Sequence, residues 1–215
     1  MGFRLDGFVG YNQMADGNQA AALTRYARDG SLVVSEAHGK FYEQASRGNM
    51  YCALSASGGI ALIAVAANIP TLWNPLGSGV NLELVRLQLG WVSGACAPVA
   101  LNWDFLNPAG ATVATGAPIA SATFITPVNC LVGAGKVSQA KFAAAAITFT
   151  ANPAFFMPTG IGIGTGAPTV VPSIISVDYD GQIVLPPGSA LSLVAQAGTT
   201  TALYQVGMWY VEQAV

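Results

Sequence analysis

Hydrophobic and polar residues alternate most clearly over residues 80–91. The alternation runs from Val80 to Leu84, slips by one residue at Val85, and then continues to Trp91. A period of two residues is typical of a half-buried strand. A one-residue slip arises from a β-bulge or from a strand that leaves one sheet for another. We therefore expect one long bent strand that crosses between the two sheets of a sandwich.

Shorter apolar segments surround this strand and are separated by turns rich in glycine, proline, asparagine and serine. Asn74-Pro75 starts one such turn and Asn107-Pro108 another, because proline fixes φ and biases the preceding residue toward an extended conformation. The further expected strands are 50–57, 59–66 and 97–106, and residues 173–181, 182–198 and 202–213 are expected to form three or four more. Short strands at regular spacing predict an all-β fold, a jelly-roll-like antiparallel β-sandwich with a body over residues 49–215.

Two segments of the body have mixed signals. Residues 137–152 combine an alanine-rich stretch that favours helix with an ITFT sequence that favours strand, and we allow a short helix there. Residues 157–172 are rich in glycine and proline and predict an exposed loop.

The first 48 residues differ from the body in composition. Ten of the eighteen charged residues lie within the first fifty positions, and this break predicts an N-terminal arm over residues 1–48. Asp16 can cap a short helix over residues 18–28, with Gly30 as its C-cap. Residues 40–48 fit either a single helical turn or an extended piece, and this alternative stays open.

Charge is the unusual feature of the composition. The 215 residues contain 8 Lys+Arg and 10 Asp+Glu, or 8% charged residues against roughly 25% in ordinary soluble domains. The longest apolar run is too short to span a membrane, and no secretion signal is evident at the N-terminus. The sequence has no cluster of lysine and arginine residues of the kind that binds nucleic acid or anionic lipid. We expect a protein kept in the cytosol whose surface is covered largely by other protein subunits.

Candidate catalytic and metal-binding residues are few. His38 is the single histidine, and no nucleophile motif accompanies it. Asp178 and Asp180 would face the same side of a strand, which suits calcium or acid–base chemistry, but an Asp-Gly turn with two solvated acids is the preferred interpretation. The glycine-rich stretch 160–166 lacks the lysine of a phosphate-binding loop, so a surface loop is expected. We therefore expect no catalytic, cofactor-binding or metal-binding residues, and no enzyme activity.

Aromatic residues and cysteines give two further expectations. Trp91, Trp103 and Trp209 alternate with other residues in strand patterns and are expected in the core, whereas Trp73 beside a turn is the most plausible exposed aromatic. The three cysteines, Cys52, Cys96 and Cys130, have no metal-ligand spacing and are expected to be small buried hydrophobic residues.

The order of several segments resembles that of virion structural proteins of tailed bacteriophages, and most closely of head decoration or cement proteins. The segments are SLVVSEAHGKFYEQASRGNMY, TLWNPLGSGVNLELVRLQLGWVSG, IVLPPGSALSLVAQAG and the terminal VGMWYVEQ. The resemblance implies a jelly-roll-like sandwich, a homotrimer, an arm that reaches to neighbours, and binding to the major capsid protein on the virion after synthesis in the host cytoplasm. The alternative is a tail-associated or fibre-associated β-sandwich that recognises the host or binds carbohydrate, with Trp73 or the 158–168 loop at its tip. Another virion role, in the tail or connector, and a hydrolase are the remaining alternatives.

Overall fold

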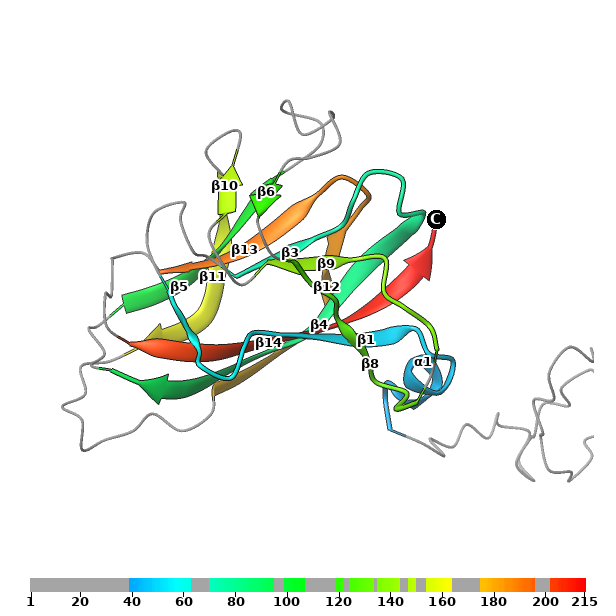
Figure 1. Cartoon of the computed structure of the whole chain (residues 1–215), viewed down its shortest axis with the longest axis horizontal. Coiled ribbons are helices and arrows are strands. Elements are labelled where there is room, and N and C mark those ends of the chain that lie inside the picture. The colour runs from blue at the N-terminus through cyan, green and yellow to red at the C-terminus, as the bar shows by residue number, and fades with distance from the viewer. Residues whose placement is uncertain are drawn as a thin grey trace, which may run out of the picture. The chain divides into compact units, whose positions relative to one another are not determined.

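The computed structural model describes residues 39–62, 70–94, 99–106, 119–121, 124–133, 135–143, 147–149, 154–163, 175–195 and 202–215 (Figure 1). The chain divides into two units, Met1–Lys40 and Phe41–Val215, and the described strands all lie in the second. The described part of this second unit consists of antiparallel strands and one short helix, so the expected all-β class is confirmed. The helix predicted over residues 18–28 lies outside the described residues.

The first sheet has β4 (Val80–Ser93) and β14 (Leu203–Ala214) at its centre. Its strand order is β12 (Ile175–Leu185), β4, β14, β1 (Met50–Leu54) and β8 (Val128–Asn129), and β2 (Ile60–Ala61) also pairs with β14. The second sheet has the order β11 (Ala154–Ile163), β5 (Val99–Leu106), β13 (Ala190–Ala195), β3 (Thr71–Trp73), β9 (Lys141–Ala143) and β7 (Phe124–Ile125). β6 (Ile119–Ser121) and β10 (Ile147–Phe149) form a separate pair.

The connectivity is that of a jelly roll. The eight principal strands, in chain order, are β1, β3, β4, β5, β11, β12, β13 and β14. They pair as β12-β4-β14-β1 in one sheet and as β11-β5-β13-β3 in the other, so that the last strand of the chain lies beside the first. Pairing of this kind in two facing sheets defines the double Greek key of a jelly roll. The jelly-roll prediction is confirmed.

The one-residue slip near Val85 is a β-bulge. On β14 the neighbours Trp209 and Tyr210 pair with Arg86 and Leu84, which leaves Val85 as the extra residue of β4. The bulge restores the alternation, so that leucines before and after it point into the core. β4 pairs with β14 from Val80 to Ser93 and with β12 from Leu82 to Leu89, all within the first sheet. The expectation that this strand crosses between the two sheets is therefore wrong, since the bulge alone accounts for the slip.

The core lies between the sheets and contains a polar bridge that joins them. Trp103 on β5 donates its indole N–H to the Tyr179 hydroxyl on β12 at 2.9 Å, and that hydroxyl donates to the Thr159 carbonyl on β11, also at 2.9 Å. The rings of Trp103 and Tyr179 meet edge to face with centroids 5.8 Å apart. Burial raises the pKa of Tyr179, so the hydroxyl stays protonated and able to donate.

Replacing Tyr179 by phenylalanine is expected to lower the free energy of unfolding by about 2 kcal/mol, because a buried indole N–H and a buried carbonyl each lose a hydrogen bond. Chemical denaturation of the variant and the wild type measures this difference. Tyr42→Phe, at an exposed position in the helix, is the matched control and should be nearly neutral. A loss no greater than that of the control would show that the bridge contributes nothing to stability.

Two predictions about the body are corrected. Residues 141–143 and 147–149 form β9 and β10 where a helix was allowed, because Phe142 is fully buried in the core and pairs with Leu72 and Ile125; such packing outweighs the propensity of alanine. Residues 157–163 belong to β11 and not to an exposed loop. β11 is an edge strand with two register shifts, which is where a sheet tolerates proline and glycine.

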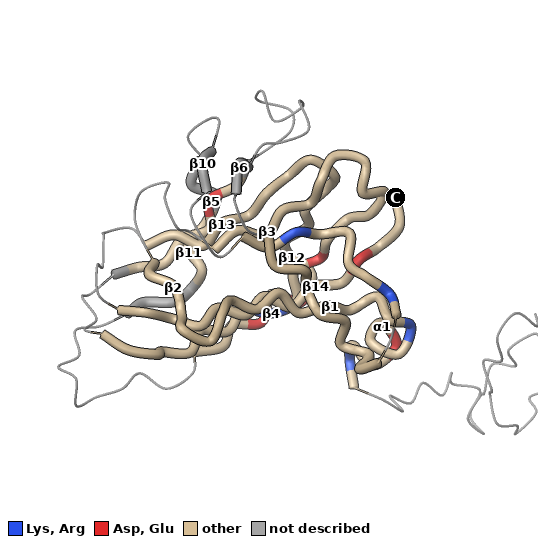
Figure 2. Tube along the Cα trace, viewed as in Figure 1, with Lys and Arg blue, Asp and Glu red and all other residues tan. Residues whose placement is uncertain are grey.

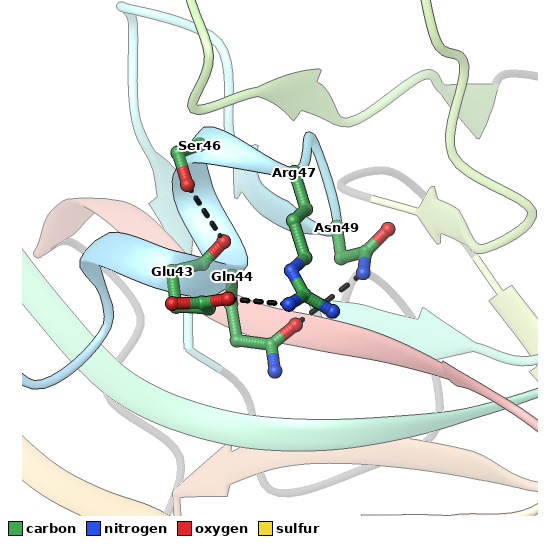
Figure 3. Close-up of polar contacts among 5 residues, drawn as sticks. All are labelled: Glu43, Gln44, Ser46, Arg47 and Asn49. Carbon is green, nitrogen blue, oxygen red and sulfur yellow. Dashed lines mark hydrogen bonds and ion pairs between the residues drawn. The ribbon is translucent and has the colours of Figure 1, made fainter. Parts of the chain in front are cut away.

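The short helix α1 (Tyr42–Ser46) decides the alternative left open for residues 40–48 in favour of a helical turn. Figure 3 shows its polar contacts: Glu43 forms an ion pair with Arg47, and Asn49 donates to Gln44 at 3.3 Å. The chain then enters β1, where the Asn49 carbonyl accepts a hydrogen bond from the Glu212 amide at 2.9 Å. Although the predicted arm ends at residue 48, α1 belongs to the unit that begins at Phe41.

Candidate functional site

The outer face of the first sheet, which is the face directed away from the core, carries both apolar and polar side chains. Core residues such as Tyr51, Leu87 and Met208 alternate with the residues of this face along each strand. The register places its side chains in rows across the sheet. One row is Val128, Cys52, Trp209, Arg86 and Asp178, and the next is Leu54, Gly207, Gln88 and Ser176. Each row changes from apolar on β8 and β1 to polar on β4 and β12.

The polar side of the outer face centres on Arg86. Its Nε donates to Asp178 Oδ1 at 2.5 Å, and this hydrogen bond raises the pKa of the guanidinium. Asp178 and Asp180 are both exposed, as predicted for solvated acids. The predicted hairpin turn is wrong, because β12 continues through these residues with a bulge opposite Val85. Asp180, at φ 50°, and Gly181, at φ 83°, provide the left-handed conformations that this bulge needs.

Trp209 occupies the middle of the outer face and does not point into the core. An added Cβ on Gly207 would lie 2.7 Å from Trp209 Cζ3 and 3.0 Å from Cη2, so the six-membered part of the indole lies directly over this glycine. Only glycine permits such close contact between an indole ring and a strand backbone. Gly207 is thereby buried, while Trp209 remains half-buried. The expectation that Trp209 packs in the core is therefore wrong.

The other tryptophans are placed differently from one another. Trp73 is 8% exposed and its ring centroid lies 5.6 Å from that of Phe124, so the expectation of an exposed aromatic there is wrong. Trp103 is fully buried and Trp91 packs against the core, as predicted. Trp73 is the last residue of β3, whose three residues are all buried, so both faces of this strand are covered. The alternation of apolar and polar residues did not reveal this.

Several aliphatic side chains are exposed in the described part of the chain, and one group of them lies in and after β8 at the edge of the first sheet. Four of them lie between residues 128 and 137, a set that we call the apolar edge: Val128 (68% exposed), Leu131 (41%), Val132 (95%) and Val137 (62%). Figure 2 shows that charged residues are few along the strands and gather near α1. Burial of exposed aliphatic side chains against a partner is favourable and stabilises the complex that covers them.

The two described cysteines lie beside the apolar edge as half-buried free thiols. The register places Cys52 opposite Val128, and the Cys130 amide donates to the Met50 carbonyl at 2.9 Å. Burial, with a smaller contribution from Cys130, raises the pKa of Cys52 to about 12. Both thiols therefore stay protonated near neutral pH and behave as apolar side chains. Cys96 lies outside the described residues.

Two buried carboxylates lie apart from this face. Glu212 Oε1 accepts hydrogen bonds from the Ser138 hydroxyl at 2.6 Å and from the Gln139 amide at 2.8 Å. The Ser138 hydroxyl is also 2.6 Å from the hydroxyl of Tyr210, so these groups tie the segment before β9 to β14. The buried side chains of Glu212, Ser138 and Tyr210 therefore form one hydrogen-bonded group. Asp104 on β5 is 6% exposed, and its Oδ1 has no hydrogen-bond partner in the described part of the chain.

The remaining predicted sites are only partly described. His38 and residues 164–166 of the glycine-rich stretch lie outside the described residues, and residues 160–163 form the end of β11. Within the described ranges, no three histidine, cysteine, aspartate or glutamate side chains are arranged to hold a metal ion.

The helix of the described residues, α1, is not long and apolar enough to cross a membrane.

Comparisons with protein-family models, with curated proteins and with solved structures give no match to this chain. The functional assignment therefore depends on the fold, on the outer face and apolar edge, and on the resemblance in the order of segments.

Proposed function

We propose that this protein is a structural subunit of a virion that decorates and reinforces the capsid shell of a tailed bacteriophage. The observation that carries the proposal is the apolar edge, whose four exposed aliphatic side chains lie in a chain with only 8% charged residues. Such a surface suits contact with protein subunits better than contact with solvent. The jelly roll recurs in viral capsid proteins, which supports the proposal by analogy of fold alone.

The proposed mechanism is mechanical. A subunit that binds neighbouring shell proteins only in their assembled arrangement stabilises that arrangement by mass action. Burying each exposed aliphatic side chain contributes on the order of 1 kcal/mol, and many copies act on one shell. In the proposed homotrimer, the apolar edge meets a different surface of the next copy, and closure of the ring prevents open-ended association.

Val132→Asp is expected to weaken self-association and shell binding by about tenfold or more, because it places a charge at the most exposed side chain of the apolar edge, 95% exposed. Multi-angle light scattering reports the assembled mass, and co-sedimentation with shells that lack this protein reports occupancy. Val184→Asp, at an aliphatic position on β12 that is 48% exposed, is the matched control and should behave as the wild type.

Two results would count against the proposal. One is a wild-type protein that remains monomeric at micromolar concentration and does not sediment with shells. The other is electron microscopy of virions that locates the protein only at the tail tip, which would favour the host-recognition alternative.

A further inference from the structure

A solvent-facing aromatic ring lies in the middle of the outer face. The indole of Trp209 rests with one side on the backbone of Gly207, and Leu54 Cδ1 lies 3.5 Å from the position of an added Cβ on that glycine. Trp209 is half-buried, and the side of its ring that rests on Gly207 is covered, so its exposed part lies on the ring edge and the opposite side. This exposed part of the indole offers a ligand an aromatic contact.

Planar polar groups lie on the side of this ring toward β4 and β12, and along β14. Gln88 lies directly opposite Gly207 on β4, and Gln205 lies opposite Gly90 one row further along the same face. The ion pair of Arg86 with Asp178 lies in the same row as Trp209, with side chains 44% and 51% exposed. Amide, guanidinium and carboxylate groups each offer pairs of donors or acceptors in one plane. Gly90 and Gly207 carry no side chains, so these groups border a shallow surface.

We propose that this part of the outer face binds a neutral oligosaccharide of gluco-configured pyranose rings. Such a ring has C–H groups that carry a partial positive charge on its faces, which suit the negative face of an indole, and hydroxyl pairs around its edge, which suit planar polar side chains. Because the surface is open, it fits a chain segment and not an enclosed monosaccharide. The jelly roll also recurs in lectin domains, which is an analogy of fold alone.

Two other classes of ligand fit the surface less well. In this part of the face, Arg86 is grouped with three acids, Asp178, Asp180 and Glu83. Phosphate binding depends on excess positive charge, so a nucleic acid or a phosphorylated ligand would be repelled. A protein partner would gain more from the apolar edge, since the side chains nearest to Trp209 toward β4 are polar. The oligosaccharide site goes beyond the proposed shell function and does not depend on it.

The test uses the full-length protein with cellohexaose and maltohexaose, two unbranched glucose chains of different linkage. Saturation-transfer NMR and titration of tryptophan fluorescence should show saturable, about millimolar binding of at least one of them, as expected for an open surface with one stacking ring. Trp209→Leu, which still covers Gly207 but has no π face, should weaken binding by about tenfold or more. Trp209→Phe should retain most of it, and Gln213→Ala, on the same strand and face, is the matched control.

The proposal is overturned if neither oligosaccharide binds saturably, or if Trp209→Leu binds as well as the wild type. Light scattering of the same variants separates this proposal from the shell function. If Trp209→Leu reduces the assembled mass, Trp209 belongs to a subunit contact and the oligosaccharide proposal is wrong. Unchanged mass with lost oligosaccharide binding supports it, whatever the outcome at Val132. Thermal unfolding checks that each variant remains folded.

Discussion

Replacing Glu212 by alanine is expected to lower the free energy of unfolding by about 3 kcal/mol, the largest effect of a single polar side chain among the described residues. Its Oε1 accepts from the Ser138 hydroxyl at 2.6 Å and from the backbone amides of Gln139 and Ala140, at 2.8 and 3.4 Å. Glu212 is 6% exposed and Ser138 is 3% exposed, so water cannot fully replace the lost acceptor. The segment before β9 would then lose its main attachment to β14.

Urea denaturation followed by tryptophan fluorescence measures this change. Glu212→Gln keeps an oxygen acceptor of the same reach and should cost about 1 kcal/mol, which separates the loss of the acceptor from the loss of packing. Glu83→Ala removes a carboxylate from the outer face, where Glu83 is half-buried, and should cost less than about 0.5 kcal/mol. If alanine at position 212 costs no more than glutamine, the hydrogen bonds do not stabilise the fold.

The strand pattern and the jelly-roll class could be predicted because burial on one face leaves a period-two signal in sequence. The slip in the alternation located the β-bulge at Val85, the residue at which the structure has it. One inserted residue moves the side chains that follow it to the opposite face of the strand, and this change is visible in the sequence. The same signal cannot say which sheet a strand joins. We therefore expected this strand to cross between sheets, whereas among the described strands it pairs with β12 and β14 of the first sheet.

Segments whose local preference conflicts with their packing could not be predicted. Phe142 is held in the core by strands that come from distant parts of the sequence, and no window around it contains this information. Residues 157–163 have the composition of a loop, yet they pair with β5 because an edge strand with bulges tolerates proline and glycine. Both errors arise from contacts between residues far apart in the chain.

The surface around Trp209 could have been found from the sequence, although it was missed. Tyr204, Val206, Met208 and Tyr210 share one phase of the final strand and all point into the core. Trp209 has the opposite phase, and Gly207 two residues earlier leaves room for its ring. The apolar edge left no comparable signal, because aliphatic residues beside a short strand look the same whether they are buried or exposed.

Asp104 is expected to make the protein less stable as the pH rises from about 4 to about 7. The carboxyl is 6% exposed, and burial raises its pKa from 3.8 to about 6. The folded state therefore binds this proton more tightly than the unfolded state. Below the unfolded pKa the carboxyl is protonated in both states, so its burial does not lower the free energy of unfolding there. The cost grows as the pH passes from the unfolded to the folded value, and it reaches roughly 2–3 kcal/mol above pH 6.

Asp104→Asn removes this titration and keeps nearly the same shape. The variant should be more stable than the wild type by on the order of 2 kcal/mol near pH 7.5, and about equal to it near pH 4, because at that pH the folded wild type carries no ionised carboxylate at this position. Urea denaturation at a series of pH values measures the difference, in which the titration of the other carboxylates cancels. A difference that stays constant across this range, or that favours the wild type at high pH, would show that the Asp104 carboxylate is ionised in the folded protein without cost.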